Sequence, residues 1–318
     1  MKPYAIGIDV GGTKIATGLL DRSMNVLSVH VTKEHAGRLP AQVVDAIERA
    51  YGEVLQQAGI SASQVAGVGL SFAGHTNGQR GVVLTSSNMP QWDQVPLRDI
   101  VSKRLNQHVL LDNDTNLGVL AEHRYGAGHG FDNMVFLTMG TGLGAGIIVD
   151  GRLYHGTDDL AGEIGHVRLT RGGPVGHNKR GSAEGWASGS GIEQIAKRAV
   201  ADARRRGCST ILTAHRETVT ARDVCAAAKR GDVVAMRIVR STGERLGQVL
   251  AILVDILNPE RIVIGGLAMR TGEMMLGPAR AVMAREALPA SARSCQIVPA
   301  ALGERIGDVA ALCVAMEL

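Results

Sequence analysis

Three glycine-rich turns carry residue types that suit the binding of a nucleotide, and each follows a short apolar segment. They span Asp9–Lys14 (Asp-Val-Gly-Gly-Thr-Lys), Gly140–Gly146 (Gly-Thr-Gly-Leu-Gly-Ala-Gly) and Ile262–Gly266 (Ile-Val-Ile-Gly-Gly). Glycine adopts positive φ without penalty and lets the backbone approach a bulky anion closely. Successive N–H groups of such a turn can form a concave nest for phosphate. The three turns therefore predict a protein that holds a nucleotide by its phosphates.

Neither of two common phosphate-binding motifs accounts for these turns. A P-loop requires a Gly-Lys pair, and the chain contains none. Gly140, Gly142 and Ala145 fit the loose G-x-G-x-x-A form, but a dinucleotide fingerprint opens a helix. Here a β-branched run follows and ends at Asp150, which is typical of a strand. The first turn leads into Ile15–Leu20 in the same way, so we interpret both as β-hairpin turns. An ordinary hairpin, with glycine only for turn geometry, stays the alternative for either one.

The overall composition is that of a two-domain enzyme. A length of 318 residues favours two domains, and 45% hydrophobic residues suffice for two cores. The net charge of +4 is mild, and we interpret Arg204–Arg206 as a solvated helix end rather than a nucleic-acid patch. Apolar stretches such as Val249–Leu257 are too short to span a membrane. We therefore expect neither a nucleic-acid nor a membrane partner.

The cysteines and the start of the chain favour the cytoplasm. The four cysteines are widely spaced and form no C-x-x-C, which predicts reduced thiols. The first strand is expected about four residues from Met1, which leaves no room for a signal peptide or an N-terminal DNA-binding domain.

Hydrophobic periodicity predicts that the two halves of the chain repeat one α/β pattern. In the first half we expect a hairpin at 4–21, strands at 26–32, 65–71 and 109–111, and helices at 41–58 and 96–106. In the second we expect a hairpin at 133–150, helices at 191–206, 220–229 and 232–257, and a strand at 261–264. A last helix at 306–317 should return to the first half. The pattern predicts a duplicated fold with a cleft between two domains, residues 1–115 plus 302–318 and residues 116–301.

Five motifs in this order resemble the ROK family of bacterial sugar kinases, in the sugar kinase/actin/Hsp70 superfamily. They are Asp9-x-Gly-Gly-Thr-Lys14, Asn113-Asp114-x-Asn116, Gly140-Thr-Gly-x-Gly144, Gly162-Glu-Ile-Gly-His166 and Asn258-Pro-Glu-Arg-Ile-Val-Ile-Gly-Gly266. The resemblance runs from Ile6 to about Ala315 and implies a duplicated actin-like (ribonuclease H-like) α/β fold. Many ROK proteins are repressors with an N-terminal winged helix. We expect no room for such a domain before the first strand, so this chain resembles the kinase branch.

The resemblance implies ATP-dependent phosphorylation of the primary (6-) hydroxyl of a hexose, with glucose as the first choice. Phosphoryl transfer needs a group that takes the hydroxyl proton. Asp114, just beyond the strand at 109–111, is the best-placed carboxylate for this general base, since an ordinary aspartate is ionised at neutral pH. From the residues alone, an N-cap of the segment that follows is the alternative role for Asp114.

The nucleotide residues are implied by the same motifs. Asp9 resembles the acidic residue that orients hydrated Mg²⁺, which needs few protein carboxylates, and a turn-initiating aspartate is the alternative. Lys14 supplies a positive charge near the phosphates or is a solvated strand residue. The full predicted set for ATP is Asp9, Gly11, Gly12, Thr13, Lys14, Gly140, Thr141, Gly142, Gly144, Gly265 and Gly266.

The sugar pocket should contain side chains that match vicinal hydroxyls, because an unmatched buried polar group costs about 1–3 kcal/mol. By resemblance these are Gly74, Asn88, Asn113, Asp114, Glu163, His166 and Glu184. Alone, Glu163 would be an exposed helix-start charge and His166 a core histidine. Their joint occurrence in Gly-Glu-Ile-Gly-His favours sugar binding.

One departure from the family concerns zinc. Most members carry C-x-C-G-x-x-G-C-x-E, completed by the histidine that corresponds to His166. Here Val175, His177 and Ser182 stand at the three cysteine positions, while Glu184 is retained. A structural Zn²⁺ normally takes four N/S ligands, and two histidines cannot supply them. We expect no structural zinc and a loop held by packing, although any binding of a metal by His166 and His177 stays open.

The sugar and the assembly are less sharply defined by the sequence. N-acetylmannosamine, N-acetylglucosamine, mannose and fructose kinases share nearly all these motifs. A non-catalytic sugar-sensing protein is the alternative of a different class, but it needs neither Asp114 nor two phosphate turns. An NAD-dependent dehydrogenase is disfavoured by the strand after Gly146. The family resemblance implies a homodimer or a homotetramer.

Overall fold

The computed structural model describes residues 2–12, 14–23, 25–33, 39–86, 89, 91–214 and 218–303. They form two compact units: unit 1 runs up to Tyr125 and includes Leu153–Ala161, and unit 2 comprises Gly126–Arg152 and Gly162–Gly303. The boundary expected after residue 115 would cut the first turn of helix α3 (Asp114–Tyr125), which lies whole in unit 1. A helix is cooperative, so a unit boundary falls beyond its end. The helix expected at 306–317 lies outside the described residues.

Unit 1 is built on a five-stranded sheet in the order β3-β2-β1-β4-β8. The strands are β1 (Tyr4–Val10), β2 (Ile15–Asp21), β3 (Val26–Thr32), β4 (Val65–Phe72) and β8 (Val109–Asn113). Strand β1 pairs antiparallel with β2 and parallel with β4, and β4 pairs parallel with β8. The expected hairpin and its three companion strands are therefore confirmed.

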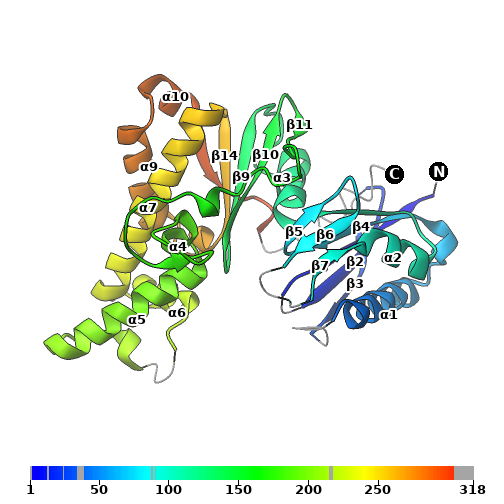
Figure 1. Ribbon diagram of the computed structural model, residues 1–318, viewed down its shortest axis with the longest axis horizontal. Coiled ribbons are helices and arrows are strands. Elements are labelled where there is room, and N and C mark those ends of the chain that lie inside the picture. The colour runs from blue at the N-terminus through cyan, green and yellow to red at the C-terminus, as the bar shows by residue number, and fades with distance from the viewer. Residues whose placement is uncertain are drawn as a thin grey trace. The chain divides into compact units, whose positions relative to one another are not determined.

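Helix α1 (Pro40–Ala58) covers β2 and β3 of this sheet, as Figure 1 shows. It begins with Pro40 in its first turn and ends at Gly59, whose φ of 66° lies in the left-handed region. The apolar positions expected to face the sheet, which include Val43, Ile47 and Val54, are all buried. Hydrophobic spacing alone thus predicted the buried face of α1.

A second, small sheet in unit 1 was not expected. It contains β5 (His75–Asn77), β6 (Val82–Thr85) and β7 (Asp93–Val95) and is followed by α2 (Leu97–Leu105); the short 3₁₀ helix η1 (Ala62–Gln64) precedes β4. Strands of three or four residues are too short for an alternation of apolar and polar residues to stand out. Only their packing in the folded unit identifies them.

Unit 2 repeats the strand order of unit 1. Its sheet runs β11-β10-β9-β14-β15, with β9 (Met134–Met139), β10 (Leu143–Val149), β11 (Arg152–Leu153), β14 (Arg261–Gly266) and β15 (Gln296–Pro299). Strand β9 pairs antiparallel with β10 and parallel with β14, as β1 does with β2 and β4. The duplicated hairpin predicted from the glycine turns is confirmed.

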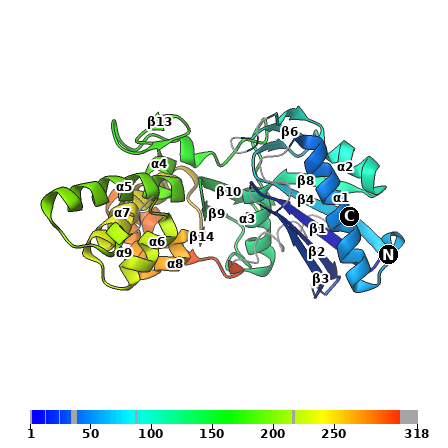
Figure 2. The same cartoon turned by 90° about the horizontal axis from the view of Figure 1, so that it is seen from below.

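The helices of unit 2 lie beside this sheet, and Figure 2 shows α5, α6, α7 and α9 gathered there. Its helices and short elements are η2 (Ile164–His166), β12 (Val175–Gly176), β13 (Lys179–Arg180), α4 (Ala183–Ala187), α5 (Gly189–Arg206), η3 (Ile211–Ala214), α6 (Ala221–Lys229), α7 (Val233–Leu257), α8 (Leu267–Thr271), α9 (Glu273–Glu286) and α10 (Pro289–Ser294). The sequence predicted α5, α6 and α7 but missed α9, whose pattern is interrupted by Pro278. Within the described part of the chain, we find no helix long and apolar enough to cross a membrane.

Candidate functional site

Polar side chains line the carboxyl ends of three neighbouring parallel strands in unit 1. Asp9 of β1 lies opposite Ser71 of β4, and Ser71 lies opposite Asp112 of β8. The Ser71 hydroxyl donates to Oδ1 of Asp9 at 2.7 Å. Because the ends of parallel strands meet at one edge of a sheet, this edge holds two carboxylates in register, and the carboxylate of Asp9 is fixed in orientation by Ser71.

Asp112 is the buried carboxylate of this edge. Its Oδ1 accepts hydrogen bonds from the backbone N–H of Asn113 at 2.7 Å and from Nδ2 of Asn116 at 2.9 Å. Its Oδ2 lies 2.9 Å from Nε2 of His155, which reaches unit 1 on the segment Leu153–Ala161. The sequence analysis missed this cluster, because Asp112 and His155 are 43 residues apart and only the fold joins them.

Asn113 and Asp114 lie where β8 ends and α3 begins. Oδ1 of Asn113 accepts from the N–H of Thr115 at 2.8 Å, and its Nδ2 donates to the carbonyl of Gly74 at 2.8 Å. Asn113 thus caps α3, a role for which Asp114 was the sequence candidate. Asp114 is the exposed first residue of the helix, and the Thr115 hydroxyl donates to its Oδ1 at 3.2 Å. The structure thus brings two of the predicted sugar residues, Gly74 and Asn113, into contact, with Asp114 next in the chain.

The first glycine turn connects β1 to β2. The N–H of Gly11 donates to the carbonyl of Lys14 at 3.0 Å and closes the turn. Gly11 and Gly12 are half-buried, whereas Lys14 is exposed. Two other predicted site residues, Thr13 and Asn88, lie outside the described residues. The turn therefore lies at the same sheet edge as Asp9, with its backbone accessible.

The second glycine turn connects β9 to β10 and packs on the start of α5. The N–H of Gly140 donates to the carbonyl of Gly142 at 3.0 Å. The carbonyl of Gly140 accepts from Gly189 at 2.8 Å, and that of Thr141 accepts from Ser190 at 3.2 Å. The turn is thus locked in place by the first N–H groups of a long helix.

Gly140 and Gly142 differ in what their missing side chains would meet. A Cβ on Gly142 would lie 2.6 Å from Oε2 of Glu184, so packing explains that glycine. A Cβ on Gly140 would meet no described atom within 4 Å, and its φ is not in the left-handed region. The described residues thus leave room for a side chain at Gly140, whereas Glu184 occupies that space at Gly142.

The third glycine turn lies beside the second. Gly265 and Gly266 of β14 pair with Thr138 and Met139 of β9, and Gly140 follows directly. Gly266 has a φ of 75°, and a Cβ there would lie 2.2 Å from the carbonyl oxygen of Met139. Gly144 is on β10, opposite Thr138. The structure thus gathers the predicted nucleotide glycines of unit 2 at one edge of its sheet.

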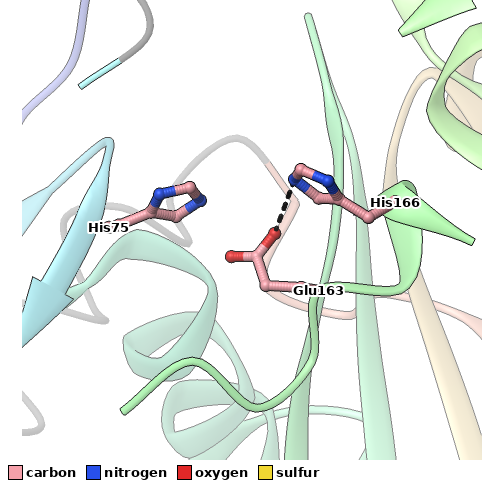
Figure 3. A group of neighbouring side chains, drawn as sticks. All are labelled: His75, Glu163 and His166. Carbon is pink, nitrogen blue, oxygen red and sulfur yellow. Dashed lines mark ion pairs between the residues drawn. The ribbon is translucent and has the colours of Figure 1, made fainter. Parts of the chain in front are cut away.

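Two of the predicted sugar residues flank the 3₁₀ helix η2. Glu163 is at its N-cap position but makes no side-chain capping bond, and His166 is its last residue. Oε2 of Glu163 lies 3.6 Å from Nε2 of His166, and Figure 3 shows the carboxylate turned toward the ring. Both side chains are more than a third exposed, at 38% and 40%, so they are accessible to a ligand.

Glu184, the third predicted sugar residue of unit 2, lies against the second glycine turn. Its Oε2 accepts from the N–H of Leu143 at 3.2 Å and lies 2.9 Å from Nε2 of His177. The His177 ring stacks on that of His166, with 3.7 Å between centroids. The sequence predicted neither contact, because only the folded loop brings the His177 ring beside Glu184 and His166.

The loop that lacks the cysteines is held by hydrogen bonds. The Ser182 hydroxyl is fully buried, donates to the carbonyl of Gly176 at 3.1 Å and accepts from the N–H of Gly185 at 3.1 Å. The Gln194 side chain accepts from the backbone N–H of Val175 at 2.9 Å and donates to its carbonyl at 2.7 Å. The expectation of packing alone therefore understated the role of polar contacts.

Comparison with known proteins gives the family. Residues 5–317 match the model described as "ROK family". The chain belongs to the ROK family. A glucokinase of Halalkalibacterium halodurans is 33% identical, over 96% of this chain and 93% of that protein. A xylose repressor of Caldicellulosiruptor bescii is 30% identical, over 98% of this chain and 77% of the repressor.

A solved ROK structure covers the whole fold. The ROK glucokinase of Streptomyces griseus, in complex with glucose and AMPPNP, has a TM-score of 0.84 at 32% identity, with coverage of 99% of this chain and 100% of that chain. Together with the repeated strand order, this confirms the predicted duplicated actin-like α/β fold with two domains. The resemblance drawn from five motifs is likewise confirmed.

The described thiols of this ROK protein are poor candidates for site chemistry. Burial raises the pKa of the Cys295 thiol to about 11 and also raises the pKa of Cys225. Both therefore stay protonated at neutral pH, whereas the thiolate is the nucleophile and the metal ligand. Cys208 is exposed, and Cys313 lies outside the described residues.

Proposed function

We propose that this ROK protein transfers the γ-phosphoryl group of ATP to the 6-hydroxyl of a hexose, with glucose as the preferred acceptor. The protein is a sugar kinase; the identity of the sugar and the position of transfer are the finer part of the proposal. The observation that supports it best is the exposed Asp114 at the first position of α3, directly after an asparagine locked by two hydrogen bonds.

In this proposal Asp114 is the general base. As the sugar hydroxyl attacks, its proton passes to the carboxylate, which an ionised aspartate accepts without a prior protonation step. The Nδ2 group of Asn113 has two N–H donors, and within the described residues it uses one for Gly74, so the other would donate to a sugar hydroxyl. The two adjacent residues would then orient and activate the same substrate.

The nucleotide would lie along the glycine turns. Gly140 supports this role because no described atom would obstruct a side chain there, yet the residue is glycine. Asp9, held by the Ser71 hydroxyl, fits the single carboxylate that a largely hydrated Mg²⁺ needs. When bound, Mg²⁺ neutralises charge on the β- and γ-phosphates.

The sugar is proposed to contact Glu163 and Glu184 in unit 2. Changing either to Gln retains size but weakens charge-assisted hydrogen bonds worth about 1.5–3 kcal/mol each. We expect the KM for sugar to rise roughly 10- to 100-fold, while the KM for ATP changes much less, both measured by steady-state kinetics. A raised KM for ATP with an unchanged KM for sugar would assign Glu184 to the nucleotide site. The experiment can distinguish the two sites because Glu184 also accepts a hydrogen bond from Leu143, beside the second glycine turn.

The decisive experiment is a coupled ADP-release assay with a panel of hexoses and 2-acetamido hexoses. We expect glucose to give the highest kcat/KM. A clear preference for N-acetylmannosamine, N-acetylglucosamine, mannose or fructose would replace glucose and keep the kinase. Absence of ADP release with every sugar would contradict the kinase itself.

A second candidate is a non-catalytic sugar sensor, which the 30% identity to a xylose repressor favours. A sensor would bind a sugar in calorimetry without releasing ADP, and Asp114→Asn would leave its sugar affinity unchanged.

We also propose a cytoplasmic homodimer or homotetramer without a nucleic-acid or membrane partner, which light scattering and a DNA-binding assay on the purified protein would test.

A further inference from the structure

His177 occupies a backbone position that residues other than glycine seldom take. Strands β12 and β13 pair Gly176 with Lys179, so His177 and Asn178 form a two-residue hairpin loop. Their φ values are 50° and 56°, as a type I′ turn requires. Asparagine and glycine suit such positions, whereas a larger side chain is disfavoured there. The side chain of His177 must therefore offset this cost.

That side chain links two predicted sugar residues. Its Nε2 lies 2.9 Å from Oε2 of Glu184, and its ring stacks on His166 at an interplanar angle of 22°. The side chains of His177 and Glu184 are only 20% and 13% exposed, so water competes little for the contact. A carboxylate only accepts hydrogen bonds, so the Nε2–H group of His177 is the donor.

Both described contacts of the Glu184 carboxylate involve the same oxygen atom. In the part of the chain that the structure describes, the carboxylate contacts with His177 and Leu143 both go to Oε2. Two donors on one oxygen fix the plane of the carboxylate and leave Oε1 for a ligand. His177 stands where most of the family has a zinc-binding cysteine, so a direct hydrogen bond takes the place of the metal scaffold.

We propose that His177 is a positioning residue, which holds Oε1 of Glu184 toward the sugar hydroxyls in place of the family's metal site. The inference rests on the proposed function, in which Glu184 binds the sugar. It differs from a purely structural role in one respect. Loss of the imidazole should weaken sugar binding without weakening the fold, since the turn itself prefers glycine or asparagine.

The test is His177→Gly, which suits the left-handed turn and removes the imidazole. We expect the KM for the preferred hexose to rise about tenfold, which corresponds to about 1.4 kcal/mol, with the KM for ATP within about twofold of wild type. The melting temperature should stay equal or rise. Free imidazole added to the variant should lower its KM for sugar again. Asn178→Gly is the matched control, because it alters the same turn and keeps the ring.

The possible outcomes separate the inference from the function that it rests on. A sugar KM unchanged in His177→Gly but raised in Glu184→Gln overturns the role of His177 and keeps the kinase. An equal rise in Asn178→Gly assigns the effect to the turn and also overturns the role of His177.

If His177→Gly does not fold, His177→Asn is measured instead, since asparagine tolerates the same φ. The double variant His177→Gly/Glu184→Gln should match Glu184→Gln alone, because coupled residues are not additive. The proposed function itself fails in a different experiment, the ADP-release assay, if the wild-type protein releases no ADP with any sugar.

Discussion

The hairpins of the two units have the same strand pairing but carry different residues at equivalent positions. In unit 1, Asp9 lies one residue before the last antiparallel pair of the hairpin and faces Ser71 on the neighbouring parallel strand. In unit 2, the equivalent Thr138 faces Gly265. Unit 1 thus presents the carboxylate of Asp9 at this position, whereas unit 2 presents a threonine beside a glycine. In the proposed function the two edges would contribute different groups, a carboxylate for magnesium in unit 1 and glycine backbone for phosphate in unit 2, because function depends on the residues at the strand ends rather than on the fold.

The largest expected effect concerns the charged edge. Replacing Asp114 by Asn keeps the shape and removes the proton acceptor, so kcat should fall roughly 10²- to 10⁴-fold while sugar binding by calorimetry changes little. Asp150→Asn is the control, since Asp150 is an exposed hairpin residue with a φ of 50° that asparagine tolerates. An Asp114→Asn variant that keeps more than about a tenth of wild-type kcat would show that Asp114 is not the general base.

The next effect concerns the glycine edge. Gly140→Ala meets no described atom within 4 Å, so the melting temperature should not change. If ATP approaches this backbone, a loss of about 1.5–3 kcal/mol in charge-assisted hydrogen bonds should raise the KM for ATP roughly 10- to 100-fold. Gly266→Ala is the contrasting variant, because its φ of 75° and the 2.2 Å approach to Met139 predict a less stable protein. A normal ATP KM in Gly140→Ala would mean that the nucleotide does not approach this turn.

The comparison also shows which features the sequence reveals. Both hairpins, α1 and the Asn113–Asp114 pair were predicted, since each depends on local spacing or on one short motif. The contact of Asp9 with Ser71 joins residues 62 apart, and that of Leu143 with Glu184 joins residues 41 apart. Such contacts follow from strand register and loop path, which leave no local trace in the sequence. This is why sequence reasoning can propose individual site residues but misses the side chains that contact them.

A smaller effect is expected in the loop without cysteines. Ser182→Ala removes the N-cap of α4 and leaves the N–H of Gly185 without its acceptor. A lost cap costs about 0.5–2 kcal/mol, and about 1 kcal/mol lowers the melting temperature of a 150–250-residue domain by roughly 2–4 °C. Differential scanning calorimetry measures this, with Ser23→Ala at an exposed turn as the control. Equal melting temperatures for the two variants would mean that the hydrogen bonds of Ser182 do not stabilise the loop.

The smallest expected effect is that of removing zinc, for which we expect none. Two of the three positions that carry cysteine in most of the family bear polar side chains here, and both are engaged elsewhere, Ser182 with backbone groups and His177 with Glu184. A structural zinc site normally needs four nitrogen or sulfur ligands, so the purified protein should contain no stoichiometric zinc. A zinc-selective chelator should therefore leave the melting temperature unchanged, while activity still requires added Mg²⁺. Elemental analysis that finds about one zinc per chain, together with a chelator-induced loss of stability, would show that unit 2 keeps a metal through other ligands. His177 would then orient Glu184 only as part of that metal site, and the comparison of the two units would have to include a bound cation in unit 2.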